Sequence, residues 1–123
     1  MMKLNRGINL GGYLSQCVHT HEHYRSFIGE DDIKQIAAWG FDHIRLPIDC
    51  EVLETAEGAK KPEGYQYVSN AVSWSQKYNL NIILDLHKAY GYDFNNAGDS
   101  SKNNLFTSPE LKKRFIRLWE NIS

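Results

Sequence analysis

The chain contains three short segments whose hydrophobic and polar positions follow the patterns of β-strands. Residues 6–10 (RGINL) end at a Gly-Gly pair, and residues 41–46 (FDHIRL) are stopped by Pro47. The third segment lies within residues 80–94 (LNIILDLHKAYGYDF) and begins as an apolar run of the kind that a strand buried on both faces requires. The pattern therefore predicts three strands, the third of them in the core.

Three longer segments repeat apolar residues with the period of an amphipathic helix. Residues 30–40 (EDDIKQIAAWG) begin with acidic side chains and end at a capping glycine. Residues 65–78 form a second predicted helix, and a third starts at residues 107–110 (TSPE), which suit a helix cap with proline in the first turn. The apolar stripes are Ile33, Ile36 and Ala37, then Val68, Ala71 and Val72, and finally Leu111, Phe115, Leu118, Trp119 and Ile122.

Strands and helices therefore alternate three times, which predicts an α/β chain with right-handed crossovers and a parallel sheet. The joins from helix to strand are short, whereas the strand-to-helix loops are long and irregular. All of that irregular length lies at the carboxyl ends of the strands, where α/β folds place their functional sites.

Polar side chains occur near the same strand ends. Asp85 and His87 are two residues apart and share one face of the third strand, and Arg45 and Asn9 lie on one face of the other two. We expect Asn9, Arg45 and His87 to point toward one mouth. Chance alternation in three short strands is the alternative.

Composition narrows the possible partners. The 123 residues include 14 basic and 15 acidic side chains, a formal charge of −1, which suits one domain and argues against nucleic-acid or anionic-membrane binding. No apolar run approaches the ~20 residues that span a bilayer. The start, MMKLNRGINL, lacks the apolar region of a signal peptide, so a cytoplasmic location is expected. Cys17 and Cys50 are too few for a disulfide framework and are predicted to be free thiols.

Four segments, in order and spacing, resemble glycoside hydrolase family 5, the cellulase family of (β/α)8 TIM barrels. They are RGINLGGYLSQ (6–16), GFDHIRLPID (40–49), NLNIILDLHKAYG (79–91) and LFTSPELKKRFIRLW (105–119). The resemblance implies that residues 1–123 form a single domain, the first three βα units of such a barrel. It also implies endo-hydrolysis of β-1,4 or mixed-linkage glucan with retention of configuration, without a cofactor. The GINLGG segment is in addition similar to that of exo-1,3-glucanases.

The resemblance assigns roles to particular residues. Arg45 matches the family's strand-2 arginine, which orients the catalytic nucleophile, and His87 matches a histidine that lines the cleavage subsite. Asn9, Lys88, Tyr90 and Tyr92 are further candidates for substrate binding, although the tyrosines could instead pack the loop that follows the third strand. Lys88 and Tyr90 depart from the residues that many members carry.

The family's two catalytic glutamates are expected beyond Ser123. A retaining glycosidase needs two carboxyl groups about 5–5.5 Å apart. Asp85 is interpreted as a buried structural partner for a nearby cation, with Arg45 as the candidate. No acidic residue here matches either catalytic role; those considered are Glu22, Asp49, Glu51, Asp85, Asp93 and Asp99. The chain alone is therefore predicted to be inactive.

Two other functions compete with this prediction. His19, His21 and His23 form an H-x-H-x-H cluster that could serve a metal-dependent hydrolase, but its position in a loop favours a solvated surface cluster. Alternatively, a partial barrel with two unpaired strand edges could act through sugar binding, self-association or pairing with the missing barrel segment. No P-loop, G-x-G-x-x-G or G-x-S-x-G motif supports phosphate or triad chemistry.

Overall fold

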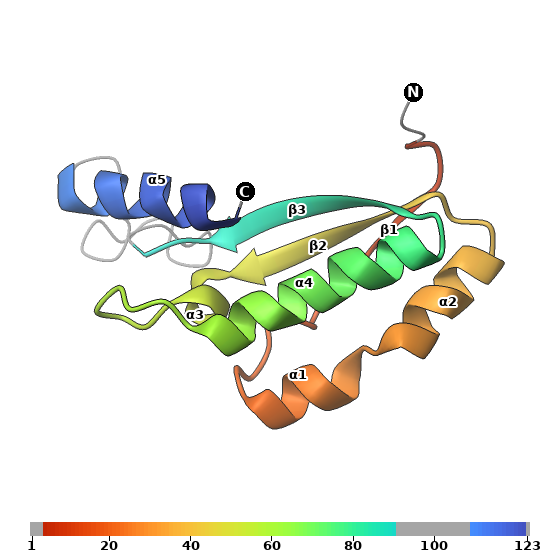
Figure 1. Ribbon diagram of the computed structural model, residues 1–123, viewed down its shortest axis with the longest axis horizontal. Coiled ribbons are helices and arrows are strands. Elements are labelled where there is room, and N and C mark those ends of the chain that lie inside the picture. Colours follow the sequence, from red (N-terminus) through yellow and green to blue (C-terminus); the bar gives the residue numbers. More distant parts are fainter. Residues whose placement is uncertain (1–3, 91–108, 123) are drawn as a thin grey trace.

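A three-stranded parallel sheet forms the centre of the computed structural model, which describes residues 4–90 and 109–122 (Figure 1). The strands are β1 (Gly7–Asn9), β2 (His43–Asp49) and β3 (Asn81–Lys88), in the order β1-β2-β3. The parallel pairing confirms the predicted α/β architecture. It aligns Asn9 with Arg45 across the first pair of strands.

β2 runs through Pro47, where the sequence pattern predicted its end. The backbone of Arg45 faces β1, because its carbonyl accepts the Leu10 N–H at 2.9 Å, and Asp49 faces the same side by donating to Leu14. Pro47 lies between these two residues, beyond the end of β1. Its missing N–H therefore leaves no ladder bond unmade, and the strand can continue.

Five helices accompany the sheet in the described residues: α1 (His21–Phe27), α2 (Glu30–Ala38), α3 (Cys50–Leu53), α4 (Pro62–Lys77) and α5 (Pro109–Ile122). The pattern predicted α2, α4 and α5 but not α1 or α3. Both of these are short, and α1 is mostly polar, so neither carries a clear apolar stripe. The Thr20 side chain caps α1 by accepting the His23 N–H at 3.2 Å. None of the described helices is long and apolar enough to span a bilayer.

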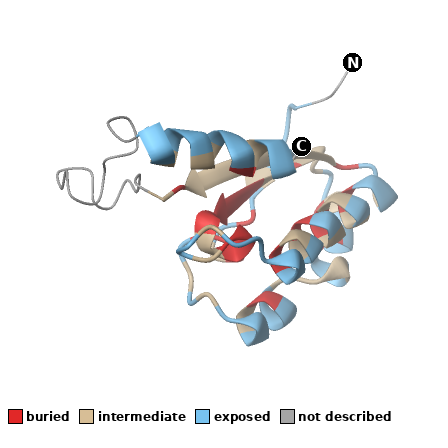
Figure 2. Cartoon of the chain, turned by 60° about the vertical axis from the view of Figure 1, so that its left-hand side comes forward, coloured by how far each residue is buried: buried red, intermediate tan, exposed pale blue. Residues whose placement is uncertain are grey.

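The hydrophobic core lies on one face of the sheet, against α2, α3 and α4. On β2, Ile44, Leu46 and Ile48 are fully buried there, and Figure 2 shows the buried positions concentrated in β2 and α3. β3 is only partly buried, contrary to the prediction of a core strand, because in the described residues it pairs with β2 alone. On the opposite face Ile83 is 38% exposed. Cys17 and Cys50 are free thiols, as predicted.

Arg114 attaches α5 to the segment that follows α3. Its guanidinium donates to Glu54 at 2.6 Å and to the carbonyls of Ala56 and Thr55 at 2.7 and 2.5 Å. It also lies 3.9 Å from the ring centre of Tyr90. Because Glu54 is only 4% exposed, Arg114 is the cation that compensates a buried carboxylate.

We expect Arg114→Met to destabilise the fold by roughly 3–5 kcal/mol, because Glu54 would be left buried without its cation. Urea unfolding followed by circular dichroism measures the change. Arg117→Met on the same helix is the matched control, since Arg117 is exposed. Equal unfolding free energies for the two variants would contradict the role assigned to Arg114.

Gly64, in the first turn of α4, marks the closest approach between helices α3 and α4. A Cβ atom at this position would lie 1.7 Å from the carbonyl oxygen of Val52. We therefore expect Gly64→Ala to lower the free energy of unfolding by about 3 kcal/mol. Gly11→Ala is the control, because nothing lies within 4 Å of its added Cβ. Thermal unfolding measures the stability of both variants. A comparable loss of stability in the two would contradict the packing argument.

Candidate functional site

A cavity of about 170 Å³ opens at the carboxyl ends of the strands. It contains the three residues predicted to share a mouth, so the sequence correctly placed Asn9, Arg45 and His87 together. We call it the mouth cavity, and its lining residues are Asn9, Gly11, Gly12, Ser15, Gln16, Arg45, Pro47 and His87.

Asp85 connects two of these side chains. One of its carboxylate oxygens, Oδ2, accepts from the Arg45 guanidinium and lies 3.0 Å from Nδ1 of His87. Arg45 also lies 3.5 Å from the amide oxygen of Asn9. The side chains of Arg45, Asp85 and His87 are all partly exposed, between 27% and 37%. The arrangement confirms Arg45 as a partner of Asp85, but Asp85 is partly exposed and not the buried residue that was expected.

Gln16 lines the mouth cavity but was missed by the sequence analysis. Its amide nitrogen, Nε2, lies 3.2 Å from Nε2 of His87. No strand or helix pattern points to this residue, because it lies in the irregular segment between β1 and α1. The only available signal was its place within the family-like segment RGINLGGYLSQ.

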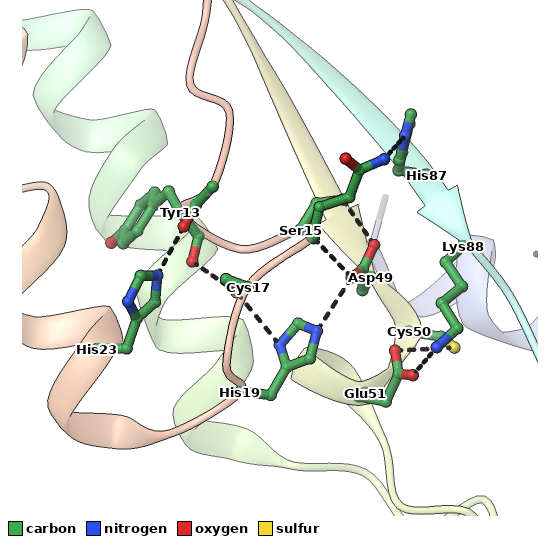
Figure 3. Close-up of polar contacts among 12 residues, drawn as sticks. Tyr13, Ser15, Cys17, His19, His23, Asp49, Cys50, Glu51, His87 and Lys88 are labelled. Carbon is green, nitrogen blue, oxygen red and sulfur yellow. Dashed lines mark hydrogen bonds and ion pairs between the residues drawn. The ribbon is translucent and has the colours of Figure 1, made fainter. Parts of the chain in front are cut away.

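Asp49, the last residue of β2, holds this segment in place. It is 5% exposed and accepts from Ser15 Oγ at 2.7 Å, the Gln16 backbone N–H at 3.0 Å and His19 Nε2 at 3.0 Å. Figure 3 shows Ser15 and His19 converging on Asp49. Burial opposes ionisation, but the hydrogen bonds from His19, Ser15 and Gln16 outweigh it and lower the pKa of Asp49 below its usual range. The network therefore contains a buried carboxylate rather than a carboxylic acid.

Lys88 and Tyr90, the other described candidates for substrate binding, do not line the mouth cavity. Lys88 forms an ion pair with Glu51 of α3. The Tyr90 hydroxyl donates to the Glu54 carbonyl at 3.0 Å, and burial is the main cause that raises the pKa of Tyr90 to about 12. These contacts join Tyr90 to the segment that follows α3, whereas the loop that Tyr90 was alternatively expected to pack lies largely outside the described residues. Tyr92 lies outside the described residues.

The three histidines of the H-x-H-x-H cluster point to different partners. His19 contacts Asp49, His21 lies 3.1 Å from Glu63, and Nε2 of His23 lies 2.6 Å from the Gly12 carbonyl oxygen. The cluster therefore does not form the three-histidine metal site that was considered, and His19, at 22% side-chain exposure, is not the solvated residue that was expected.

One group in the described residues could offer a metal three ligands: His19, Asp49 and Glu51, whose ligand atoms lie within 4.8 Å of one another. Each of these side chains already has a protein partner. Lys88 supplies Glu51 with a positive charge, and His19 and Ser15 supply Asp49 with donors. In this structure the three side chains therefore belong to a hydrogen-bond network within the protein.

Comparison with known proteins agrees with this architecture. The chain is 42% identical over 118 residues to Cellodextrinase A of Ruminococcus flavefaciens, covering 96% of this chain and 34% of the relative. It is 43% identical over 122 residues to Endoglucanase C of Acetivibrio thermocellus, covering 97% of this chain and 35% of the relative. The chain thus spans about a third of the length of these curated relatives.

Solved structures show the same fold. A glycoside hydrolase crystal structure superposes with a TM-score of 0.76 at 19% identity, covering 96% of this chain and 35% of that one. A glycoside hydrolase family 5 enzyme from Prevotella bryantii, solved with a xyloglucan tetradecasaccharide, gives 0.72 at 21% identity, with 97% and 36% covered.

A family profile also matches nearly the whole chain. The profile described as Cellulase (glycosyl hydrolase family 5) matches residues 6–123. This range includes every described residue that lines the mouth cavity. The chain therefore belongs to glycosyl hydrolase family 5.

Proposed function

We propose that residues 1–123 supply the first three βα units of a β-glucan endohydrolase that acts with retention of configuration. The observation that carries the proposal is the convergence of Asn9, Arg45 and His87 on one cavity at the strand ends. The names of the related proteins support a glucan substrate, since they include a cellodextrinase and an endoglucanase. β-1,4 and mixed-linkage glucans are the proposed substrates.

Arg45 is suited to organising a carboxylate. Its guanidinium carries five N–H donors in a fixed fork, and Asp85 engages one of its two terminal nitrogens, Nη2. The contact of the other, Nη1, with Asn9 is long, at 3.5 Å. In the proposed reaction this side of Arg45 donates to the nucleophilic carboxylate and holds it against the anomeric carbon.

His87 is suited to contacting the sugar beside the cleaved bond. Asp85 fixes the ring from the Nδ1 side, so Nε2 is the atom that faces the cavity together with Gln16. Asn9 adds a carboxamide with both a donor and an acceptor. Together these groups can hydrogen-bond to sugar hydroxyls without themselves transferring the glycosyl group.

Acid catalysis and nucleophilic attack need a pair of carboxyl groups. Among the residues that the structure describes, the lining of the mouth cavity includes no aspartate or glutamate. We therefore assign both catalytic carboxylates to later strands of the barrel, in agreement with the roughly one-third coverage of the relatives.

Sugar binding without hydrolysis is the second candidate function. It is favoured by the partly exposed face of the sheet that carries Arg45 and Asp85. Ile83 lies on the same face and is 38% exposed, so the face offers both polar and apolar surface. This candidate predicts that the mouth residues bind glucan in the chain as it stands. Association of the β3 edge with a second copy or with the rest of the barrel belongs to the same alternative.

We expect the chain to bind cellotetraose weakly, and His87→Ala to weaken binding by ~3–10-fold through loss of a hydrogen bond. Heteronuclear NMR titration measures both affinities. His21→Ala is the matched control, since His21 lies outside the mouth cavity and contacts Glu63 and Tyr67. An equal loss in the two variants would argue against the mouth cavity as the sugar site.

The purified 123-residue chain should release no reducing sugar from carboxymethylcellulose or lichenan, because the described mouth cavity offers no carboxylate. The assay is run at high protein concentration beside Arg45→Met. Turnover that persists in Arg45→Met identifies a contaminating glucanase. Turnover that Arg45→Met abolishes would show that the assignment of the catalytic pair to later strands is wrong.

A further inference from the structure

Gln16 has an unusual backbone conformation at the edge of the mouth cavity. Its φ angle is +52°, a left-handed value that residues with a Cβ atom rarely adopt. In the described residues the other non-glycine with positive φ is Asn79, just beyond α4, where asparagine is common. Glutamine, unlike asparagine, has no preference for positive φ. Strained residues that line a cavity point to a positional requirement for the side chain.

Hydrogen bonds to Asp49 stabilise this backbone conformation. It accepts the Gln16 backbone N–H at 3.0 Å and the Ser15 hydroxyl at 2.7 Å, so the two successive residues are tied to one buried carboxylate. Ser15 is itself only 2% exposed, so packing as well as hydrogen bonding holds the residue before Gln16 in place. The strain at Gln16 is therefore offset by charge-assisted hydrogen bonds.

The hydrogen bond from His19 helps to keep Asp49 ionised, because it lowers the pKa of this carboxyl group. The Tyr24 hydroxyl lies 2.6 Å from Nδ1 of His19. Burial is the main cause that raises the pKa of Tyr24, so this hydroxyl keeps its proton and is available to donate to a neutral His19. Nε2 of His19 then carries its proton toward Asp49, 3.0 Å away. Tyr24, His19 and Asp49 thus form one directed series of hydrogen bonds that ends at the Gln16 backbone.

The hydrogen bonds of His87 decide what the Gln16 side chain does. Nδ1 of His87 faces the Asp85 carboxylate at 3.0 Å, so Nδ1 carries a proton. Nε2 faces the Gln16 amide nitrogen at 3.2 Å, which can only donate, so Nε2 accepts. If the Gln16 carboxamide were turned over, its oxygen would face Nε2, and His87 would need a proton on both nitrogens. A cationic His87 is not needed to balance Asp85, because Arg45 already pairs with that carboxylate. The geometry favours a neutral imidazole.

We propose that Gln16 is a positioning residue: its carboxamide fixes His87 as the neutral Nδ1–H tautomer, and Asp49 sets the backbone conformation that this contact requires. Nε2 of His87 is then a hydrogen-bond acceptor, so a sugar hydroxyl that replaces Gln16 must donate to it. This last consequence rests on the proposed function, whereas the tautomer and its support do not.

Long-range ¹H–¹⁵N NMR of the imidazole nitrogens of the full chain at neutral pH tests the proposal. We expect wild-type His87 to be protonated on Nδ1 and unprotonated on Nε2. Gln16→Gly removes the carboxamide but suits a positive φ, and should shift the His87 Nε2 resonance several-fold more than the resonances of His43. His43 is the internal control, because its Nδ1 lies 2.6 Å from its own partner, Asp42.

The role of Asp49 is tested by Asp49→Asn and, independently, by Ser15→Ala, which removes one of the donors to Asp49. Either folded variant should shift His87 Nε2 in the same direction as Gln16→Gly, and should add little when combined with it. A merely structural role for Asp49 predicts an unchanged Nε2 resonance of His87 in the folded single variants.

Two results would overturn the proposal: wild-type His87 protonated on both nitrogens, or an Nε2 resonance that Gln16→Gly leaves unchanged. A cellotetraose titration of the same samples separates this inference from the proposed function. If the tautomer signature is present but no sugar binds, the positioning role stands and the glucan assignment fails. If sugar binds without the signature, the reverse holds.

Discussion

Buried or half-buried carboxylates that need several donors determine how the parts of this chain are tied together. An ionised carboxylate taken out of water is costly unless it is paired and hydrogen-bonded. Asp85 meets this requirement by joining β2 to its own strand through Arg45, and Asp49 meets it by drawing in residues from the segment after β1. Glu54 does the same for α5 through Arg114. The sheet brings the strands together, and these carboxylates fix what lies at their ends.

The sequence predicted the parts of the fold that depend on periodicity. The apolar positions of β2 and the stripe of α4 recur at fixed intervals, so strands, long helices and the parallel order followed from spacing alone. Arg45 and His87 could be placed together for the same reason, because side chains on one strand face and parallel strand ends share an edge. The family resemblance then gave these two residues their expected roles.

Features set by single contacts could not be predicted in this way. Lys88 turns to Glu51 rather than to the mouth cavity, and Tyr90 is occupied by Arg114 and the Glu54 carbonyl. Gln16 reaches the cavity only because its backbone adopts a left-handed conformation held by Asp49. No regular pattern encodes such contacts, since each depends on a partner more than 20 residues away in the chain.

The unequal lengths of β1 and β2 explain why there is a cavity at all. β1 has three residues and β2 has seven, so the chain leaves the sheet after Asn9 and rejoins it at Leu14, which bridges Ile48. Between these two contacts Pro47 of β2 offers no N–H to a neighbouring strand. A longer first strand would lack one ladder hydrogen bond at Pro47. The shape of the opening therefore depends on the backbone path between Asn9 and Leu14 as well as on the side chains that line it.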